Sequence, residues 1–143
     1  MHSFGVLLCL LLIQPPGGIP PVPEIPVEAL PAEAKARIGA AQREVFRNPD
    51  DANVNGELGM LLHAYEDYGL AEACYVRAAR LDPDSFQWRY LLGWVQNLRG
   101  KRDAAVQSLK AALELRPDYL PGKIKLAEIL LEAGRLAEST EVF

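Results

Sequence analysis

The sequence repeats with a period of 34 residues, and this period constrains the fold more than any other feature. A fixed period of this length indicates a stack of similar units, because each unit can bury its apolar side only against its neighbours. The register holds without insertion or deletion over residues 52–143. A shift by one period superimposes Leu58 on Leu92, Gly59 on Gly93, Ala71 on Ala105, Ala78 on Ala112, Leu81 on Leu115, Pro83 on Pro117 and Asp84 on Asp118.

The repeated small residues predict where two helices of one unit approach each other. Gly59 and Gly93 fall in the middle of a first helix, where glycine costs about 1 kcal/mol relative to alanine and therefore needs a packing reason. Gly100 and Gly134 fall between paired helices, in a turn where a positive φ is easily adopted by glycine. The repeated proline then ends the second helix and directs the chain into the next unit.

The two full units, LGMLLHAYEDYGLAEACYVRAARLDP and LGWVQNLRGKRDAAVQSLKAALELRP, resemble the tetratricopeptide repeat. The period, the Leu-Gly pair, the small residues and the closing proline all match that family, and the resemblance covers residues 52–143. The bulky aromatic residue that the family places early in the first helix is missing from the first unit, where Asn55 lies nearby. The resemblance implies an all-α solenoid of helix-turn-helix units, wound as a right-handed superhelix with a concave inner face.

The helical domain is expected to span residues 32–143. It comprises a helix at 33–47 and three repeats at 52–85, 86–119 and 120–143, of which the last is incomplete. Apolar periodicity and the punctuating glycines and prolines place the helix pairs of these repeats. The predicted pairs are 53–65 with 69–81, 86–98 with 102–115, and 121–133 with 137–143.

An apolar leader at residues 1–13 precedes this domain. It holds a ten-residue run, FGVLLCLLLI, and no Lys, Arg, Asp or Glu occurs before Glu24. The run is too short for a membrane-spanning helix, which needs about 20 apolar residues, but it fits the apolar region of a secretory signal. The leader lacks basic residues and an obvious cleavage site. We expect an exported protein, periplasmic or extracellular, which the apolar segment could hold at a membrane; a cytoplasmic protein is the alternative.

Residues 14–31 form a proline-rich linker with seven of the eleven prolines of the chain. Proline removes a backbone donor and fixes φ, which rules out a helix interior or a central strand. We interpret the segment as an extended spacer that holds the helical domain away from the leader. A ligand for a proline-binding domain is the less favoured alternative.

Composition excludes several classes of function. The 15 basic and 19 acidic residues of the 143-residue chain give a net charge of −4, so no general attraction to nucleic acid is expected. Cys9 and Cys74 cannot form a disulfide scaffold and have no metal-ligand spacing, and Cys74 is expected in the core. With no nucleophile motif, phosphate-binding loop or zinc spacing, we expect no enzyme activity, cofactor or metal.

The resemblance places a candidate binding surface on the first helices, which line the concave face. Family members that grip a peptide carboxylate use Lys, Arg and Asn there, and Lys125 is the single possible match. Met60, Tyr90, Trp94 and Ile124 instead suit an apolar helix or extended peptide, although the two aromatic residues could equally pack in the core. The candidate residues are Asn53, Met60, His63, Gln87, Tyr90, Trp94, Asn97, Ile124, Lys125 and Glu128, with Gly56, Glu57, Leu91 and Leu131 beside them.

The favoured function is a non-catalytic scaffold that binds protein or peptide segments on this concave face. One alternative is that the chain is the N-terminal helical part of a longer, truncated enzyme or assembly protein. Another is self-association, because Ile129, Leu130, Leu136, Val142 and Phe143 of the last repeat have no polar cap after them.

Overall fold

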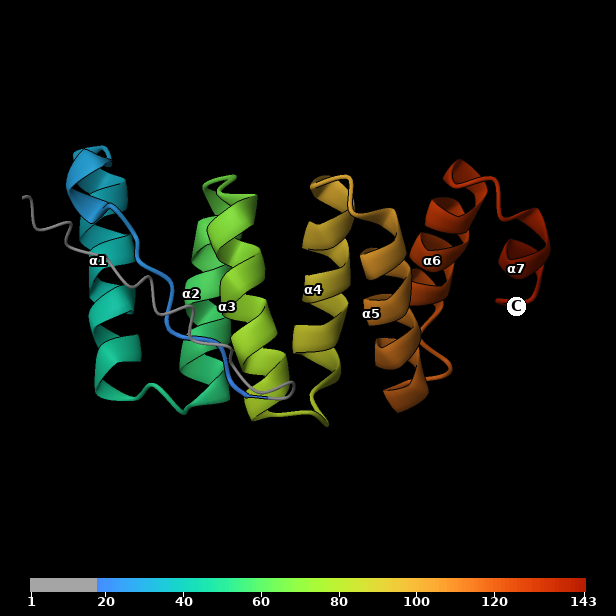
Figure 1. Cartoon of the computed structure of the whole chain (residues 1–143), viewed down its shortest axis with the longest axis horizontal. Helices are drawn as coiled ribbons and strands as arrows, with labels where there is room; N and C mark the ends of the chain where they lie inside the picture. The colour runs from blue at the N-terminus through green and yellow to red at the C-terminus, as the bar shows by residue number, and fades with distance from the viewer. Residues whose placement is uncertain (1–17) are drawn as a thin grey trace, which may run out of the picture.

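The computed structural model describes residues 18–143, and the apolar leader predicted at 1–13 lies outside the described residues. The described part consists of helices that stand side by side along the long axis of the molecule, and it contains no strand (Figure 1). In chain order the elements are the 3₁₀-helix η1 (Val27–Ala29) and the α-helices α1 (Ala32–Arg47), α2 (Ala52–Ala64), α3 (Tyr68–Leu81), α4 (Phe86–Leu98), α5 (Arg102–Leu115), α6 (Leu120–Glu132) and α7 (Leu136–Thr140).

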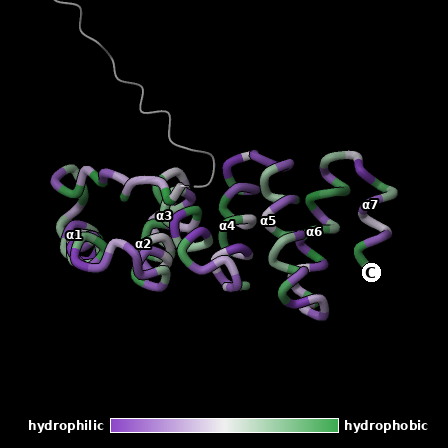
Figure 2. Tube along the Cα trace, turned by 60° about the horizontal axis from the view of Figure 1, so that its bottom comes forward, coloured by the Kyte–Doolittle hydropathy of each residue, from purple (hydrophilic) through white to green (hydrophobic). Residues whose placement is uncertain are grey.

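This arrangement confirms the all-α solenoid. Every predicted helix is present, and its ends lie within one residue of the predicted ends except in α7, which ends at Thr140 instead of residue 143. The two strongest helix pairings are α2 with α3 and α4 with α5, as expected for helical hairpins. Hydrophobic and hydrophilic residues are interleaved along the helices, because each helix buries one side against its neighbours (Figure 2).

The turns between paired helices repeat the same geometry in all three units. Gly100 and Gly134 have φ values of 73° and 74°, as their positions predicted. The equivalent residue of the first unit is Glu66, which adopts the same left-handed conformation with a φ of 62°. In each turn the N–H of this residue donates to a carbonyl three residues earlier, for example from Gly100 to Asn97 at 2.9 Å. The first unit therefore keeps the turn without the residue that favours it.

The core confirms the predicted close approach of the paired helices. A Cβ at Gly59 would lie 2.8 Å from the ring of Tyr75, and one at Gly93 would lie 2.7 Å from the side chain of Leu109. These glycines let α3 and α5 pack directly on the backbones of α2 and α4. Cys74 is buried, and its burial raises the pKa of the thiol to about 12, so the side chain acts as a small apolar residue at neutral pH.

The proline-rich segment differs from the predicted spacer over residues 18–31. It is extended apart from η1, but it runs from the lower end of α3 to the top of α1 and packs on the repeats (Figure 1). Ile25 is only 7% exposed and belongs to the same apolar core as α1 to α3. The guanidinium groups of Arg77 and Arg80 donate hydrogen bonds to the carbonyls of Pro20 and Gly18. We call residues 18–31 the strap; sequence pattern could not show that apolar residues between the prolines would anchor it.

Candidate interaction groove

Five of the ten predicted binding residues meet in one hollow between α4 and α6. Tyr90 and Trp94 lie four residues apart on α4, so their rings share one face of that helix. The facing wall is the first three turns of α6, where Ile124 and Leu120 are 44% and 55% exposed. The hollow has a volume of about 440 Å³ and is lined by Tyr90, Trp94, Leu120, Pro121, Ile124, Lys125 and Glu128. We call it the α4–α6 groove.

Tyr90 is held by aromatic rings on three sides. Its ring stacks on Phe86 at a centroid distance of 5.4 Å and meets Tyr119 and Trp94 edge-on at 5.4 and 6.0 Å. Edge-on and offset pairs of this kind contribute about 0.5–1.5 kcal/mol beyond their buried area. Burial, and then the neighbouring Tyr119, raise the pKa of Tyr90, which keeps the phenol neutral at physiological pH. The groove wall is therefore positioned before any ligand arrives.

Cationic side chains cover both ends of this aromatic cluster. The Nζ of Lys125 lies 4.7 Å from the centroid of the Trp94 ring and 3.1 Å from the carboxylate of Glu128. At the other end the guanidinium carbon of Arg116 lies 4.8 Å from the Phe86 ring. Cations over aromatic faces are attracted by the ring quadrupole. Lys125 thus belongs to the groove, but it pairs with Trp94 and Glu128 instead of forming a carboxylate clamp with other cations.

Met60 and Gln87 lie beside each other, one unit before the groove. The amide nitrogen of Gln87 on α4 is 3.6 Å from the sulfur of Met60 on α2, and both side chains are exposed. This contact joins the first helices of the first two units. The exposed surface that starts at the groove therefore continues along α4 to Gln87 and from there to Met60 on α2.

Three predicted residues occupy other places. His63 is half-buried: its Nδ1 lies 3.3 Å from the hydroxyl of Tyr75, its ring meets Tyr68 edge-on, and burial lowers its pKa, so it is neutral at physiological pH. Asn53 is exposed in the first turn of α2, where its backbone N–H donates to Asp51. Asn97 lies near the end of α4, and its carbonyl accepts the turn hydrogen bond from Gly100. None of the three lines the α4–α6 groove.

Sequence reasoning placed Gly56 on the binding face, and this is wrong. Gly56 is buried under Trp88 of α4, whose ring would overlap a Cβ at that position. Leu91, also placed on the binding face, is half-buried and packs on the core around α2 and α3. Asn55, near the position where the family has a large aromatic residue, accepts a hydrogen bond from Arg77 at 2.8 Å. Trp88, which fills this region from the next unit, was missed because its place in the period carries no repeated signal.

Two aromatic residues that pack on Tyr90 were also missed. Phe86 precedes Tyr90 by four residues on α4, which was a readable signal because such residues share a helix face. Tyr119 precedes the first residue of α6, and nothing in the periodicity of a loop position points to its contact with Tyr90. The aromatic cluster around Tyr90 therefore depends on a helix, α4, which sequence periodicity describes, and on the loop before α6, which it does not describe.

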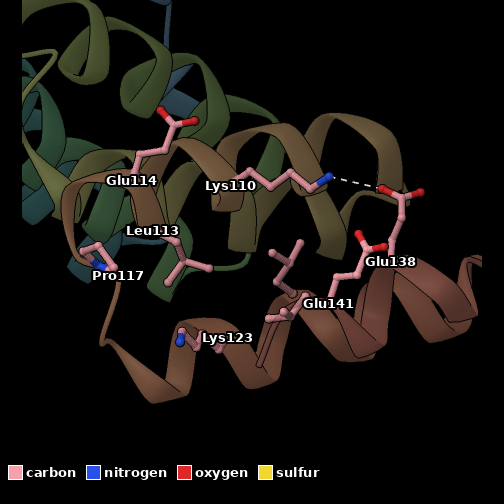
Figure 3. Close-up of a pocket in the computed structure, with 9 residues that line it drawn as sticks. Lys110, Leu113, Glu114, Pro117, Lys123, Glu138 and Glu141 are labelled. Carbon is pink, nitrogen blue, oxygen red and sulfur yellow. Dashed lines mark hydrogen bonds and ion pairs between the residues drawn. The ribbon is translucent and has the colours of Figure 1, made fainter.

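A second and larger hollow of about 510 Å³ lies between α5, α6 and α7 (Figure 3). Its floor is apolar, whereas its rim carries Lys110, Glu114, Lys123, Glu138 and Glu141. Lys110 donates to Glu138 at 3.1 Å, and the bonds from Arg135 and then Lys110 lower the pKa of Glu138 to about 2. The charges on this rim therefore partly neutralise one another, and none of the ten predicted residues lines the hollow.

Within residues 18–143, no group of three or more His, Cys, Asp or Glu side chains is placed to hold a metal ion. No helix in that part of the chain is long and apolar enough to cross a membrane. The features that gather in one place are aromatic rings, exposed aliphatic side chains and one paired lysine.

The comparisons with known proteins agree with this geometry. Sequence models described as tetratricopeptide repeat match residues 52–85 and residues 98–143, which together make up more than half of the chain. The chain belongs to the tetratricopeptide repeat family. Its helical hairpins, the glycines at their contacts and the turns between them are thus those of tetratricopeptide repeats, and the fold is that of a protein–protein interaction scaffold.

Relatives of this tetratricopeptide repeat protein include DnaJ homolog subfamily C member 3 of Rattus norvegicus, which is 31% identical over 65% of the chain. Superkiller complex protein 3 of Mus musculus is 26% identical over 74% of the chain. The matched regions are 18% and 7% of those proteins, so the chain spans less than a fifth of the length of either relative.

Solved structures with the same tetratricopeptide repeat arrangement include MamA. One MamA crystal structure has a TM-score of 0.73 at 20% sequence identity, covering 77% of this chain and 64% of that one. The structure titled MamA AMB-1 has a TM-score of 0.70 at 27% identity, covering 78% of this chain and 66% of that one. These similarities extend the solenoid assignment beyond the matched repeats to most of the described chain.

Proposed function

We propose that this protein is a non-catalytic scaffold that binds a segment of a partner protein in the α4–α6 groove. The observation that carries the proposal is the position of Tyr90 and Trp94. Both rings are held by neighbours within the same wall, yet both line an open hollow. Aromatic side chains fixed in this way lose little conformational entropy when a ligand covers them.

The lining favours an apolar helix or extended segment over a charged one. Ile124 and Leu120 expose aliphatic surface opposite the aromatic rings, and Lys125 already has Glu128 and the Trp94 ring as partners. A bound apolar side chain would cover Trp94 and Ile124 together, and such central anchors supply most of the binding energy in protein interfaces. Burial of apolar surface is therefore the proposed driving force for binding in this groove.

Site-specific photo-crosslinking tests the proposal. A photoreactive phenylalanine analogue at Ile124 should crosslink to a defined segment of one partner in the native host, and mass spectrometry would identify that segment. The same analogue at Phe46, an exposed aromatic residue on α1, is the control. Equal crosslinking from both positions, or crosslinking at Ile124 that survives the change Trp94→Ala, would argue against the groove.

Export remains a prediction from the leader sequence. Residues 1–31 fused to a reporter should carry it across a membrane in the host. A reporter that stays in the cytosol would remove this proposal and leave the groove proposal untouched.

Self-association is the second candidate function, and exposed apolar residues on the last repeat favour it. Leu136 and Phe143 are 66% and 71% exposed. A second copy could cover this surface, because exposed apolar side chains gain stability when they are buried between two copies. Light scattering after size-exclusion chromatography should then show a mass that rises with concentration and that falls back for Phe143→Ser. A strictly monomeric chain would exclude this function.

A further inference from the structure

The strap is held by two arginines that have only neutral acceptors. Arg77 on α3 is 4% exposed, and it donates to the side-chain oxygen of Asn55, to the carbonyl of Pro49 at 2.7 Å and to the carbonyl of Pro20 in the strap. Arg80, three residues later on the same face, donates to the carbonyl of Gly18. Neither arginine forms an ion pair with any acidic side chain in residues 18–143.

The guanidinium groups of Arg77 and Arg80 are thus not stabilised by an opposite charge from the described part of the chain. A buried guanidinium without a counter-ion bears a desolvation cost that carbonyl partners offset only in part. A carboxylate would place a negative charge opposite each guanidinium, which is already a charged donor, and its two oxygens match the geometry of the arginine fork. The one acidic residue beside Pro20, Glu72, already pairs with Arg99 and Lys101.

The apolar part of the strap has one deep anchor. Ile25 lies in the core formed by α1 to α3, with Val22, Val27 and Leu30 packed around it. A hollow of about 350 Å³ remains beside Ile25 and Leu30 and reaches Ile38 of α1 and Leu62 of α2. The strap therefore does not fill the surface that it covers, and another extended segment could fill it better.

We propose that the surface under the strap is a docking site for an extended acidic segment of a partner protein, and that residues 18–31 occupy it within the same chain. The partner segment carries Asp or Glu where the strap has Pro20, and Ile, Leu or Val five residues later, where the strap has Ile25. The carboxylate binds Arg77 and Arg80, and the aliphatic side chain takes the Ile25 position.

The strap acts as a competitor in this scheme. Because it is part of the chain, its effective concentration at the site is high, on the order of millimolar for a short tether. A free segment binds only if its ion pairs with the two arginines outweigh that advantage, so any change that loosens the strap should strengthen its binding. The site lies on α1 to α3 and shares no residue with the α4–α6 groove.

The test uses the full-length chain and two labelled peptides with the sequence of residues 18–31, one with Pro20→Asp and one with the uncharged Pro20→Asn. Fluorescence anisotropy measures their binding to the wild type, to Ile25→Asp and to Ile25→Asp combined with Arg80→Gln. Arg80 is exposed, so this change tests the charge without disturbing the buried Arg77 network. Circular dichroism verifies that each variant is folded.

We expect the Asp peptide to bind the Ile25→Asp variant about tenfold more tightly than the wild type, and about tenfold more tightly than the Asn peptide does. Arg80→Gln should remove most of the difference between the peptides, whereas Trp94→Ala should not change their binding. Equal binding of the two peptides, equal binding to wild type and Ile25→Asp, or no binding of the Asp peptide to the loosened chain would each overturn the proposal. These outcomes are independent of those at the α4–α6 groove.

Discussion

The ring of Trp88 lies directly over Gly56, so the first helices of the first two units touch through an aromatic face and a bare backbone. The same ring stacks against Tyr75 of α3 at a centroid distance of 6.4 Å. The Trp88 side chain of α4 therefore packs against both α2 and α3. The space for its ring exists only because residue 56 has no side chain.

Gly56→Ala should destabilise the protein by about 1–3 kcal/mol, the usual cost of forcing an extra carbon into a packed core. Alanine otherwise favours a helix by about 1 kcal/mol over glycine, so a loss of stability would isolate the clash with Trp88. Urea unfolding followed by circular dichroism measures the change.

Gly69→Ala on α3 is the matched control. A Cβ there would meet only a side-chain oxygen of Asp67 at 3.8 Å, which is an ordinary contact. This variant should be as stable as the wild type or more so, because helix propensity acts without a steric cost. If the two variants behaved alike, the packing of Trp88 over Gly56 would not be what sets the difference.

Glu66→Gly should stabilise the protein by about 0.5–1 kcal/mol. Glu66 holds the left-handed turn conformation, which costs a non-glycine residue about 1–2 kcal/mol, and part of the relief is offset because glycine gains freedom in the unfolded chain. Thermal unfolding checks this. The reverse change in the equivalent turn, Gly100→Ala, should lower the unfolding midpoint. A Cβ at Gly100 would meet no atom within 4 Å, so the positive φ alone opposes the alanine.

Periodicity was sufficient to predict the helices and the hairpin turns, because these follow from local pattern. The small residues at Gly59 and Gly93 and the turn residue Gly100 recur at fixed positions, and each has one physical reason to be there. It also brought Tyr90 and Ile124 to one surface, because first-helix positions of neighbouring units lie next to each other.

Contacts that break the period could not be predicted. Trp88 fills a space created in the preceding unit, and Tyr119 reaches Tyr90 from a loop. The strap was missed for a related reason: prolines indicate an extended chain but not whether that chain is free. Its docking depends on Ile25 and on two arginines more than fifty residues away in the sequence.

Trp94→Ala should weaken binding of the segment identified by crosslinking at Ile124 by more than about 1 kcal/mol, because the variant removes an aromatic anchor from the groove wall. Far-UV helicity should stay nearly unchanged, since the Trp94 side chain is only half-buried. Titration calorimetry with that segment gives the first quantity and circular dichroism the second. Phe46→Ala, which removes an exposed ring far along the chain, should leave the affinity unchanged; loss of helicity in Trp94→Ala would instead identify Trp94 as a core residue.

The stability contributed by Glu72 should depend on pH. Burial by itself would raise the pKa of this carboxyl, but the hydrogen bonds from Lys101 and Arg99 of the next unit outweigh it, and the pKa is lowered from its ordinary value of 4.5. A lowered pKa means that the folded state binds the proton less readily than the unfolded state. The stabilisation is therefore present above the ordinary pKa and is lost as the pH falls through the pKa of the folded state.

Glu72→Gln should therefore be less stable than the wild type at neutral pH, and the difference in urea midpoint between the two should narrow steadily below pH 4.5. Glu57→Gln, at an exposed acid on α2, is the control and should show no such gap. A gap for Glu72→Gln that stays constant as the solution is acidified would mean that the two cations do not act on Glu72 through its charge.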